Sequence, residues 1–259
     1  MSKRVFKRPE LERRIQERLE SRLSSRYERV LRRELRGAAD DAAKAFRDSG
    51  DIAGAVMQHD ARIERAIKSM YEEAYPLIGG RVAEALEQAK GYKPSEYKQF
   101  RMSDAFRIGL QAFVERWAAR KVTQISETTA AEFARIVERG VEDGLSLADT
   151  AKLIASRGRE MSAYRAHAIA RTEIHAAANA GALEAAKESG VVEMKEWIPV
   201  DDGRTRTLDN SDFDHVNVEP VPIEQPFNVS GDLLMHPGDP NGSPGNVIMC
   251  RCAMGYIVR

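Results

Sequence analysis

The amino-acid sequence predicts an α+β protein, in which a helical N-terminal region precedes a small mixed α/β C-terminal module with a few short strands. Two observations predict this fold class. Before Gly190, apolar residues recur at three- and four-residue intervals, the period of a helix face. Beyond Gly190 lie seven of the ten prolines but only one alanine, Ala253. We expect a helical, basic region over 1–145 and the module over 146–259.

Three long amphipathic helices are expected in the first region. The first carries an apolar stripe from Leu11 to Leu31 and runs to about Arg47. The second spans Ile63 to Leu86, with a kink or break expected at Pro76 and the Gly79-Gly80 pair and with Gly91 and Pro94 as terminators. The third places apolar residues from Phe106 to Val137 at helical spacing before two glycines, Gly140 and Gly144.

The module is expected to open with two separate helices. Ser146 is a typical N-cap, with Asp149 at the third position of a short helix to about Ser156. The alanine-rich stretch Ser162–Ser189 then forms a longer helix that ends at Gly190. Val191–Val200 is predicted to be a strand, and Cys250–Val258 the final strand, with turn signals between them.

Charge is sorted along the chain, although the formal net charge is zero. Residues 1–36 hold 13 Lys and Arg against 6 Glu, whereas residues 190–259 hold 5 against 11 Asp and Glu. An excess of basic side chains favours contact with DNA phosphates or with an acidic protein surface. The alternative is a solvated helix whose glutamates pair locally with arginines, for instance Glu10 with Arg14. The residues expected to make the contact are Arg4, Lys7, Arg8, Arg13, Arg14, Arg18, Arg22, Arg26, Arg29, Arg32, Arg33 and Arg36.

Composition also excludes some classes. The longest apolar runs fall short of the roughly 20 residues that a membrane span needs, so no membrane contact is expected. The basic segment Met1–Pro9 is not followed by the apolar stretch of a signal peptide. The two cysteines, Cys250 and Cys252, are too close in sequence to join easily and are expected to be thiols in a reducing compartment.

Cysteine and histidine near the C-terminus could bind a structural zinc ion. His215, His236, Cys250 and Cys252 supply four ligands of the right chemistry, with Asp202 as a substitute. The alternative is that no cofactor is bound. We expect the two cysteine side chains to point to opposite faces of the final strand, so that one of them would be buried as a small apolar residue.

A polar line is expected on the alanine-rich helix. Arg171, His175 and Asn179 follow one another at four-residue steps, whereas Glu173 lies about 160° around the helix from Arg171. The line could hold a ligand or meet the acidic tail. Alternatively the helix packs on the C-terminal sheet, Arg171 donates to loop carbonyls and Asn179 caps a turn.

An enzymatic alternative would use His215 or His236 as a base, oriented by Asp202, Glu173 or Asp239. Such a site would suit a toxin-like or processing activity. The sequence holds no nucleophile elbow, phosphate-binding loop or His-Glu-x-x-His signature. With no complete catalytic signature, a non-enzymatic role is favoured.

The order of motifs in the C-terminal half resembles that of a known family. Ile169-Ala170-Arg171-Thr172-Glu173 is followed by Asn179 and Lys195-Glu196-Trp197. The more specific part is the series Asp202 and Arg204, His215, Pro226-Phe227, His236-Pro237-Gly238-Asp239, and Asn246 through Cys250-Arg251-Cys252. Over roughly Leu147 to Val258 the chain resembles the Mu gpF-like phage head morphogenesis family.

The resemblance implies a minor head protein of a tailed phage or prophage. Its implied partners are the portal protein, the major capsid or scaffolding protein, and double-stranded DNA bound without sequence preference during assembly, packaging or ejection. Its implied location is the capsid interior near the portal, after synthesis in the host cytoplasm. Two positions depart from the family pattern. Arg206-Thr207-Leu208-Asp209 stands where members often carry Cys-x-x-Cys, and His175 stands where threonine is more frequent, so His175 inherits no role.

Overall fold

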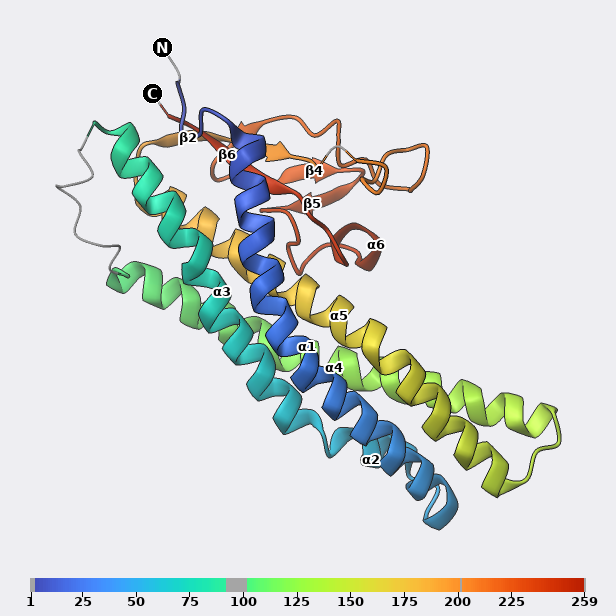
Figure 1. The fold of residues 1–259 in the computed structure, drawn as a ribbon. Coiled ribbons are helices and arrows are strands. Elements are labelled where there is room, and N and C mark those ends of the chain that lie inside the picture. Colours follow the sequence, from blue (N-terminus) through green and yellow to red (C-terminus); the bar gives the residue numbers. More distant parts are fainter. Residues whose placement is uncertain (1–2, 92–101, 201, 259) are drawn as a thin grey trace. The chain divides into compact units, whose positions relative to one another are not determined.

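The computed structural model describes residues 3–91, 102–200 and 202–258 of the chain, and Figure 1 shows its long helices and small C-terminal strands. The predicted α+β class is confirmed. In the described part of the chain, no helix is long and apolar enough to cross a membrane. The helices are α1 (Pro9–Asp48), α2 (Ile52–Met57), α3 (Asp60–Ala89), α4 (Asp104–Glu142), α5 (Leu147–Glu188) and α6 (Pro244–Val247).

The long helices pass through positions where the sequence suggested breaks. α3 continues through Pro76 and ends at Ala89, and the proposed terminator Pro94 lies outside the described residues. The prediction of two helices between Ser146 and Ser189 is wrong, because α5 is a single helix of 42 residues. Its start is as expected, since the Ser146 hydroxyl accepts from the Asp149 N–H at 3.1 Å.

Gly158 explains why α5 does not stop near Ser156. A Cβ atom on Gly158 would lie 2.3 Å from the Ala39 Cβ and 3.0 Å from the Phe133 ring, so the glycine allows close helix packing. Ala39 and Phe133 belong to an apolar cluster that also contains Val56 and Ile154. At this position glycine therefore serves contact between helices, not helix termination.

The chain forms two compact units, each assembled from segments distant in sequence. Unit 1 comprises the described residues of Met1–Leu23, Met70–Val114 and Arg171–Arg259. Unit 2 comprises Ser24–Ser69 and Glu115–Ala170. The division between a region 1–145 and a module 146–259 remains a prediction.

A small antiparallel sheet lies in unit 1. Its strands are β1 (Lys3–Arg4), β6 (Ala253–Val258), β2 (Val192–Ile198) and β3 (Val221–Pro222), in that spatial order. Lys3 pairs with Val258, so the sheet joins segments from both ends of the described chain (Figure 1). A second, two-stranded sheet is formed by β4 (Phe227–Val229) and β5 (Asp232–Leu234).

The second half of α5 is buried on every side. All residues from Thr172 to Leu183 are buried, which is why this stretch has no amphipathic pattern and is rich in alanine. The small side chains allow α3 to approach closely. A Cβ atom on Gly181 would lie 2.0 Å from the backbone carbonyl oxygen of Tyr75 in α3. On the other side of Tyr75, its ring makes an edge contact with Phe106 of α4 at 5.1 Å.

We predict that Gly181→Ala lowers the free energy of unfolding by about 1–3 kcal/mol, because the added methyl group meets backbone that cannot move alone. Helix propensity alone would predict a gain of about 1 kcal/mol. Urea unfolding monitored by circular dichroism distinguishes these outcomes. The control is Gly109→Ala in α4, whose added methyl group meets side-chain ends of Glu184 and Tyr75 at 3.0 Å. A Gly181→Ala variant as stable as the wild type would contradict the packing account.

Candidate functional site

The polar line of α5 contacts α1 within unit 1. Arg171 donates to Glu17 at 3.2 Å, His175 Nδ1 lies 2.9 Å from Glu20 Oε2, and the Gln16 amide donates to Asn179 at 3.2 Å. These partners differ from the expected loop carbonyls and turn. The sequence alone did not identify Glu20 and Gln16 as partners of this polar line. They lie one helical turn apart on α1, which is the same spacing as that of the two α5 residues that they contact.

Glu173 and Thr172 make hydrogen bonds from other sides of α5. The Tyr71 hydroxyl of α3 donates to Glu173 Oε2 at 2.5 Å, and the Met249 N–H donates to the Thr172 hydroxyl at 3.1 Å. Burial raises the pKa of Tyr71, and the neighbouring Glu173 carboxylate raises it further. Thr172, Glu173, His175 and Asn179 are therefore partnered, as buried polar groups generally are. Among the described residues, the buried Nε of Arg171 has no hydrogen-bond partner.

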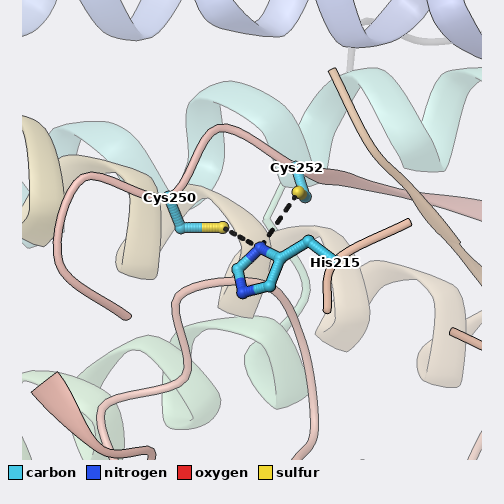
Figure 2. A group of neighbouring side chains, drawn as sticks. All are labelled: His215, Cys250 and Cys252. Carbon is cyan, nitrogen blue, oxygen red and sulfur yellow. Dashed lines mark hydrogen bonds between the residues drawn. The ribbon is translucent and has the colours of Figure 1, made fainter. Parts of the chain in front are cut away.

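Two cysteines and a histidine converge beside this part of α5 (Figure 2). Cys250 Sγ lies 3.8 Å and Cys252 Sγ 3.5 Å from Nδ1 of His215. The three donor atoms lie within 4.8 Å of one another, and the exposed fractions of His215, Cys250 and Cys252 are only 1%, 2% and 3%. We call these three residues the Cys-His cluster.

Backbone geometry explains why both cysteines reach the histidine. The expectation that the two cysteine side chains point to opposite faces is wrong, because residues i and i+2 of an extended segment lie on one face. Both cysteines precede β6, which begins at Ala253, and Met249, just before Cys250, adopts a left-handed conformation with φ of 59°. This conformation turns the chain between α6 and β6. Both sulfur atoms face the His215 ring, as Figure 2 shows.

Asn246 holds the His215 ring in one orientation. His215 Nε2 lies 2.6 Å from the side-chain oxygen of Asn246, and the Asn246 amide nitrogen donates to the Val229 carbonyl and to Asp232, each at 3.1 Å. Because the amide nitrogen is already engaged, the oxygen must accept from His215. Nε2 of His215 therefore carries the proton, and the Nδ1 lone pair faces the cysteines.

The cluster has a strong electrostatic asymmetry. The pKa of the Cys250 thiol is held well below its usual value, first by a hydrogen bond from Cys252 and then by His175 and His215, against the effect of burial. The pKa of Cys252 is raised by that same hydrogen bond and by burial. Burial would lower the pKa of His175, but Glu20 and Cys250 raise it to about 10. A negative Cys250 sulfur thus has the cationic His175 as a neighbour.

The other candidate residues of the metal and enzyme hypotheses lie in different surroundings. His236 is buried, and its Nδ1 lies 3.1 Å from the Pro237 carbonyl oxygen; burial lowers its pKa. Asp202 accepts two hydrogen bonds from Arg251, at 2.8 and 2.6 Å, which lower the pKa of its carboxyl group. The structure thus brings together three of the four proposed metal ligands, and Asp202 is engaged in an ion pair.

The arginines of α1 share one side of that helix. We define the arginine face as Arg14, Arg18, Arg22, Arg26, Arg29, Arg32, Arg33 and Arg36, all of them exposed and spaced so that they fall within about a third of a turn. In the described part of the chain, six of them have no carboxylate partner: Arg14, Arg18, Arg22, Arg29, Arg32 and Arg36. Arg33 pairs with Glu34 at 3.0 Å.

The remaining basic candidates are placed differently. Arg13 is buried and pairs with Glu17, and Arg4 pairs with Glu196 of β2 at 2.8 Å. Lys7 and Arg8 are exposed and line a hollow of unit 1 together with Arg81. Within unit 2, Arg29, Arg32, Arg33 and Arg36 line a hollow of about 430 Å³ with Asp40 at its edge.

Several glutamates of α1 bind side chains of other helices. Glu34 is buried and receives hydrogen bonds from Arg62 at 2.6 Å and from His59 at 3.2 Å. Burial alone would raise the pKa of Glu34, but these hydrogen bonds outweigh it and lower the pKa. Glu28 pairs with His167 at 2.8 Å. Local pairing between the glutamates and arginines of α1 is therefore the exception.

Comparison with known proteins gives one match. Residues 131–255 match the family model described as Phage Mu protein F like protein. This range contains the buried stretch of α5, the strands β2 to β5, the start of β6 and the whole Cys-His cluster. Searches of the curated proteins and of the solved structures found no match.

We predict that Asn246→Ala lowers the free energy of unfolding by about 2–4 kcal/mol, because it removes three hydrogen bonds and leaves His215 Nε2 without its acceptor. Chemical denaturation followed by tryptophan fluorescence measures the change, since Trp197 contacts the His215 ring at 5.4 Å. The control is Asn217→Ala, an exposed residue that bonds only to the nearby Asp214, with an expected loss below about 0.5 kcal/mol. Equal losses for the two variants would refute the orienting role of Asn246.

Proposed function

Because residues 131–255 carry a module of the Phage Mu protein F like family, we propose that the chain is a minor head protein of a tailed phage or prophage. The family indicates a phage head morphogenesis protein. We propose further that the protein joins the capsid near the portal, with the portal protein and the major capsid or scaffolding protein as partners. The single observation that carries this proposal is the family match, which the motif order from Asp202 to Cys252 supports independently.

A structural role is more consistent with the site than catalysis. His215 and His236, the bases of an enzymatic alternative, are only 1% and 5% exposed, and His215 is bonded through Nε2 to Asn246. Asp202, which would orient them, instead binds Arg251. A general base must reach a substrate proton directly or through one water molecule, and these side chains lie inside the fold.

We propose that the arginine face contacts the packaged DNA. Inward pairing of the glutamates leaves the arginines as an excess of positive charge on an exposed side of α1. Arginines that neutralise phosphates release counterions, and this release gives affinity without sequence preference.

The hollow lined by four arginines in unit 2 gives this proposal its most specific support. Guanidinium groups suit phosphate because their planar donors form paired hydrogen bonds with its oxygens. Arg29, Arg32 and Arg36 have no carboxylate partner within the described ranges, so phosphates would not compete with an existing ion pair. An acidic surface of the portal is the competing occupant of this hollow, and it would use the same arginine charges.

The head role predicts that the protein is present in purified mature particles and copurifies with the portal protein from infected or induced cells. Mass spectrometry of particles separated on a density gradient, with an antibody against the chain as a second detection method, measures this. A major tail protein serves as a control for complete particles. Absence of the chain from both particles and portal complexes would end the head proposal.

The DNA proposal predicts that the wild-type chain binds duplex DNA of unrelated sequences with similar affinity, and that the affinity falls steeply with salt. The triple variant Arg29→Gln, Arg32→Gln and Arg36→Gln should reduce the slope of log affinity against log salt by about 3. Fluorescence anisotropy over a series of salt concentrations measures this slope.

A matched triple variant controls for net charge. Arg107, Arg135 and Arg157 are exposed but each pairs with a carboxylate of its own helix. Their replacement by glutamine also removes three positive charges and should leave the salt slope nearly unchanged. If both triple variants lose affinity equally, specific use of the arginine face is refuted. If the first variant keeps its DNA affinity but fails to enter particles, the acidic protein surface is the occupant.

A further inference from the structure

The Cys-His cluster has the dimensions of a metal site. In tetrahedral zinc sites, a sulfur and a nitrogen ligand lie about 3.6 Å apart, as follows from bond lengths near 2.3 and 2.05 Å. The distances from His215 Nδ1 to the two sulfur atoms are 3.5 and 3.8 Å. Cys250, Cys252 and His215 therefore already stand at separations that a single ion could bridge.

Burial of the three side chains of the Cys-His cluster also supports a metal site. The three side chains are almost completely enclosed, and no disulfide joins the two thiols, which are both free. Two buried sulfur ligands and a neutral imidazole balance the charge of one divalent cation, so the filled site would be electrically neutral. Soft sulfur ligands with imidazole select zinc over magnesium or calcium, which prefer oxygen.

The surroundings of His215 match those of metal-bound imidazoles. Such a ring usually gives its second N–H to a carboxylate, carbonyl or amide oxygen, which fixes the tautomer. Asn246 supplies this acceptor at 2.6 Å and is itself held by Val229 and Asp232. The arrangement keeps the Nδ1 lone pair directed at the space between the two sulfur atoms (Figure 2).

His175 is suited to be the fourth ligand. Its Nδ1 is bonded to the Glu20 carboxylate at 2.9 Å, so Nε2 remains for a ligand, and its side chain neighbours Cys250. The Asn179 amide, 3.1 Å from Nε2, retains separate bonds to the His175 carbonyl and to Gln16 when the ring nitrogen is taken. Neither His175 nor His236, the fourth ligand expected from the sequence, belongs to the three-residue group, so the fourth ligand would be a side chain beside it.

We propose that unit 1 binds one zinc ion through Cys250, Cys252 and Nδ1 of His215, with His175 as the fourth ligand. The ion would join three segments of unit 1: the loop that contains His215, the turn before β6, and α5. Through Glu20 it would also fix the register of α1 against α5. This proposal does not depend on the head role or on DNA contact.

The first test uses the full-length wild-type chain. The protein is purified under reducing conditions, stripped with a chelator, exposed to Zn²⁺ and exchanged into metal-free buffer before elemental analysis. We expect about one zinc per chain and a rise of the unfolding temperature of about 5 °C or more on zinc addition, with no rise on Mg²⁺ addition. Less than about 0.1 zinc per chain would overturn the proposal.

Cobalt substitution identifies the ligands. Co²⁺ in place of zinc should give a thiolate-to-metal charge-transfer band and the intense visible bands of a tetrahedral site. Cys252→Ser and His215→Gln should each weaken zinc binding by at least about 10-fold. His167→Gln is the control, because His167 is half-buried on the same helix as His175 but bonds to Glu28. Unchanged cobalt spectra in both cluster variants would overturn the assignment.

The fourth ligand is tested by two parallel variants. His175→Gln should shift the visible cobalt bands and lower the affinity for zinc, whereas His236→Gln should leave the bands in place. Circular dichroism of the stripped proteins checks that both variants fold. The reverse result, with the shift in His236→Gln alone, would overturn the role of His175 and return His236 to the site.

Discussion

Burial of α5 on every side, from Thr172 to Leu183, is the constraint on which the rest of unit 1 depends. A helix without an exposed side needs small residues where neighbouring helices approach, and Gly181 meets the Tyr75 carbonyl for this reason. It also needs a partner for each polar group that it carries. Glu173 bonds to Tyr71 of α3, and His175 bonds to Glu20 of α1. These polar contacts specify which helix packs on each side of α5.

The same constraint sorts the charges of α1. Since α5 presents Arg171 and His175 to α1, the α1 residues that face it must be acceptors, and Glu17 and Glu20 occupy those positions. The basic residues are left for the opposite side, where solvent lowers the cost of bringing like charges together. One helix thereby combines an anionic packing surface with a cationic exposed surface. The net charge of the sequence does not show this division between two surfaces of one helix. It becomes visible only when the buried side chains are compared with the exposed ones.

Sequence periodicity predicted the class, the long helices and the cap at Ser146, because these depend on neighbours within a few residues. It failed at Gly158, where a glycine permits packing instead of ending a helix, since that distinction depends on Ala39, far away in sequence. It also placed Cys252 inside a strand, because nothing in the local sequence announces the left-handed turn at Met249. The residue types nevertheless selected the three side chains of the Cys-His cluster, which do converge. The hydrogen bond of Glu20 could not be predicted, because it depends on how the helices pack in the folded protein.

Pairing of β1 with β6 has a consequence for synthesis. Lys3 hydrogen-bonds across to the strand that contains Val258, so this edge of the sheet cannot form until almost all of the described chain has left the ribosome. Contacts between such distant segments also slow folding, because a long loop must close first. Throughout translation, the arginine-rich segment of α1 therefore lacks this anchor and is available to polyanions. Binding of RNA by the nascent chain would compete with completion of the fold.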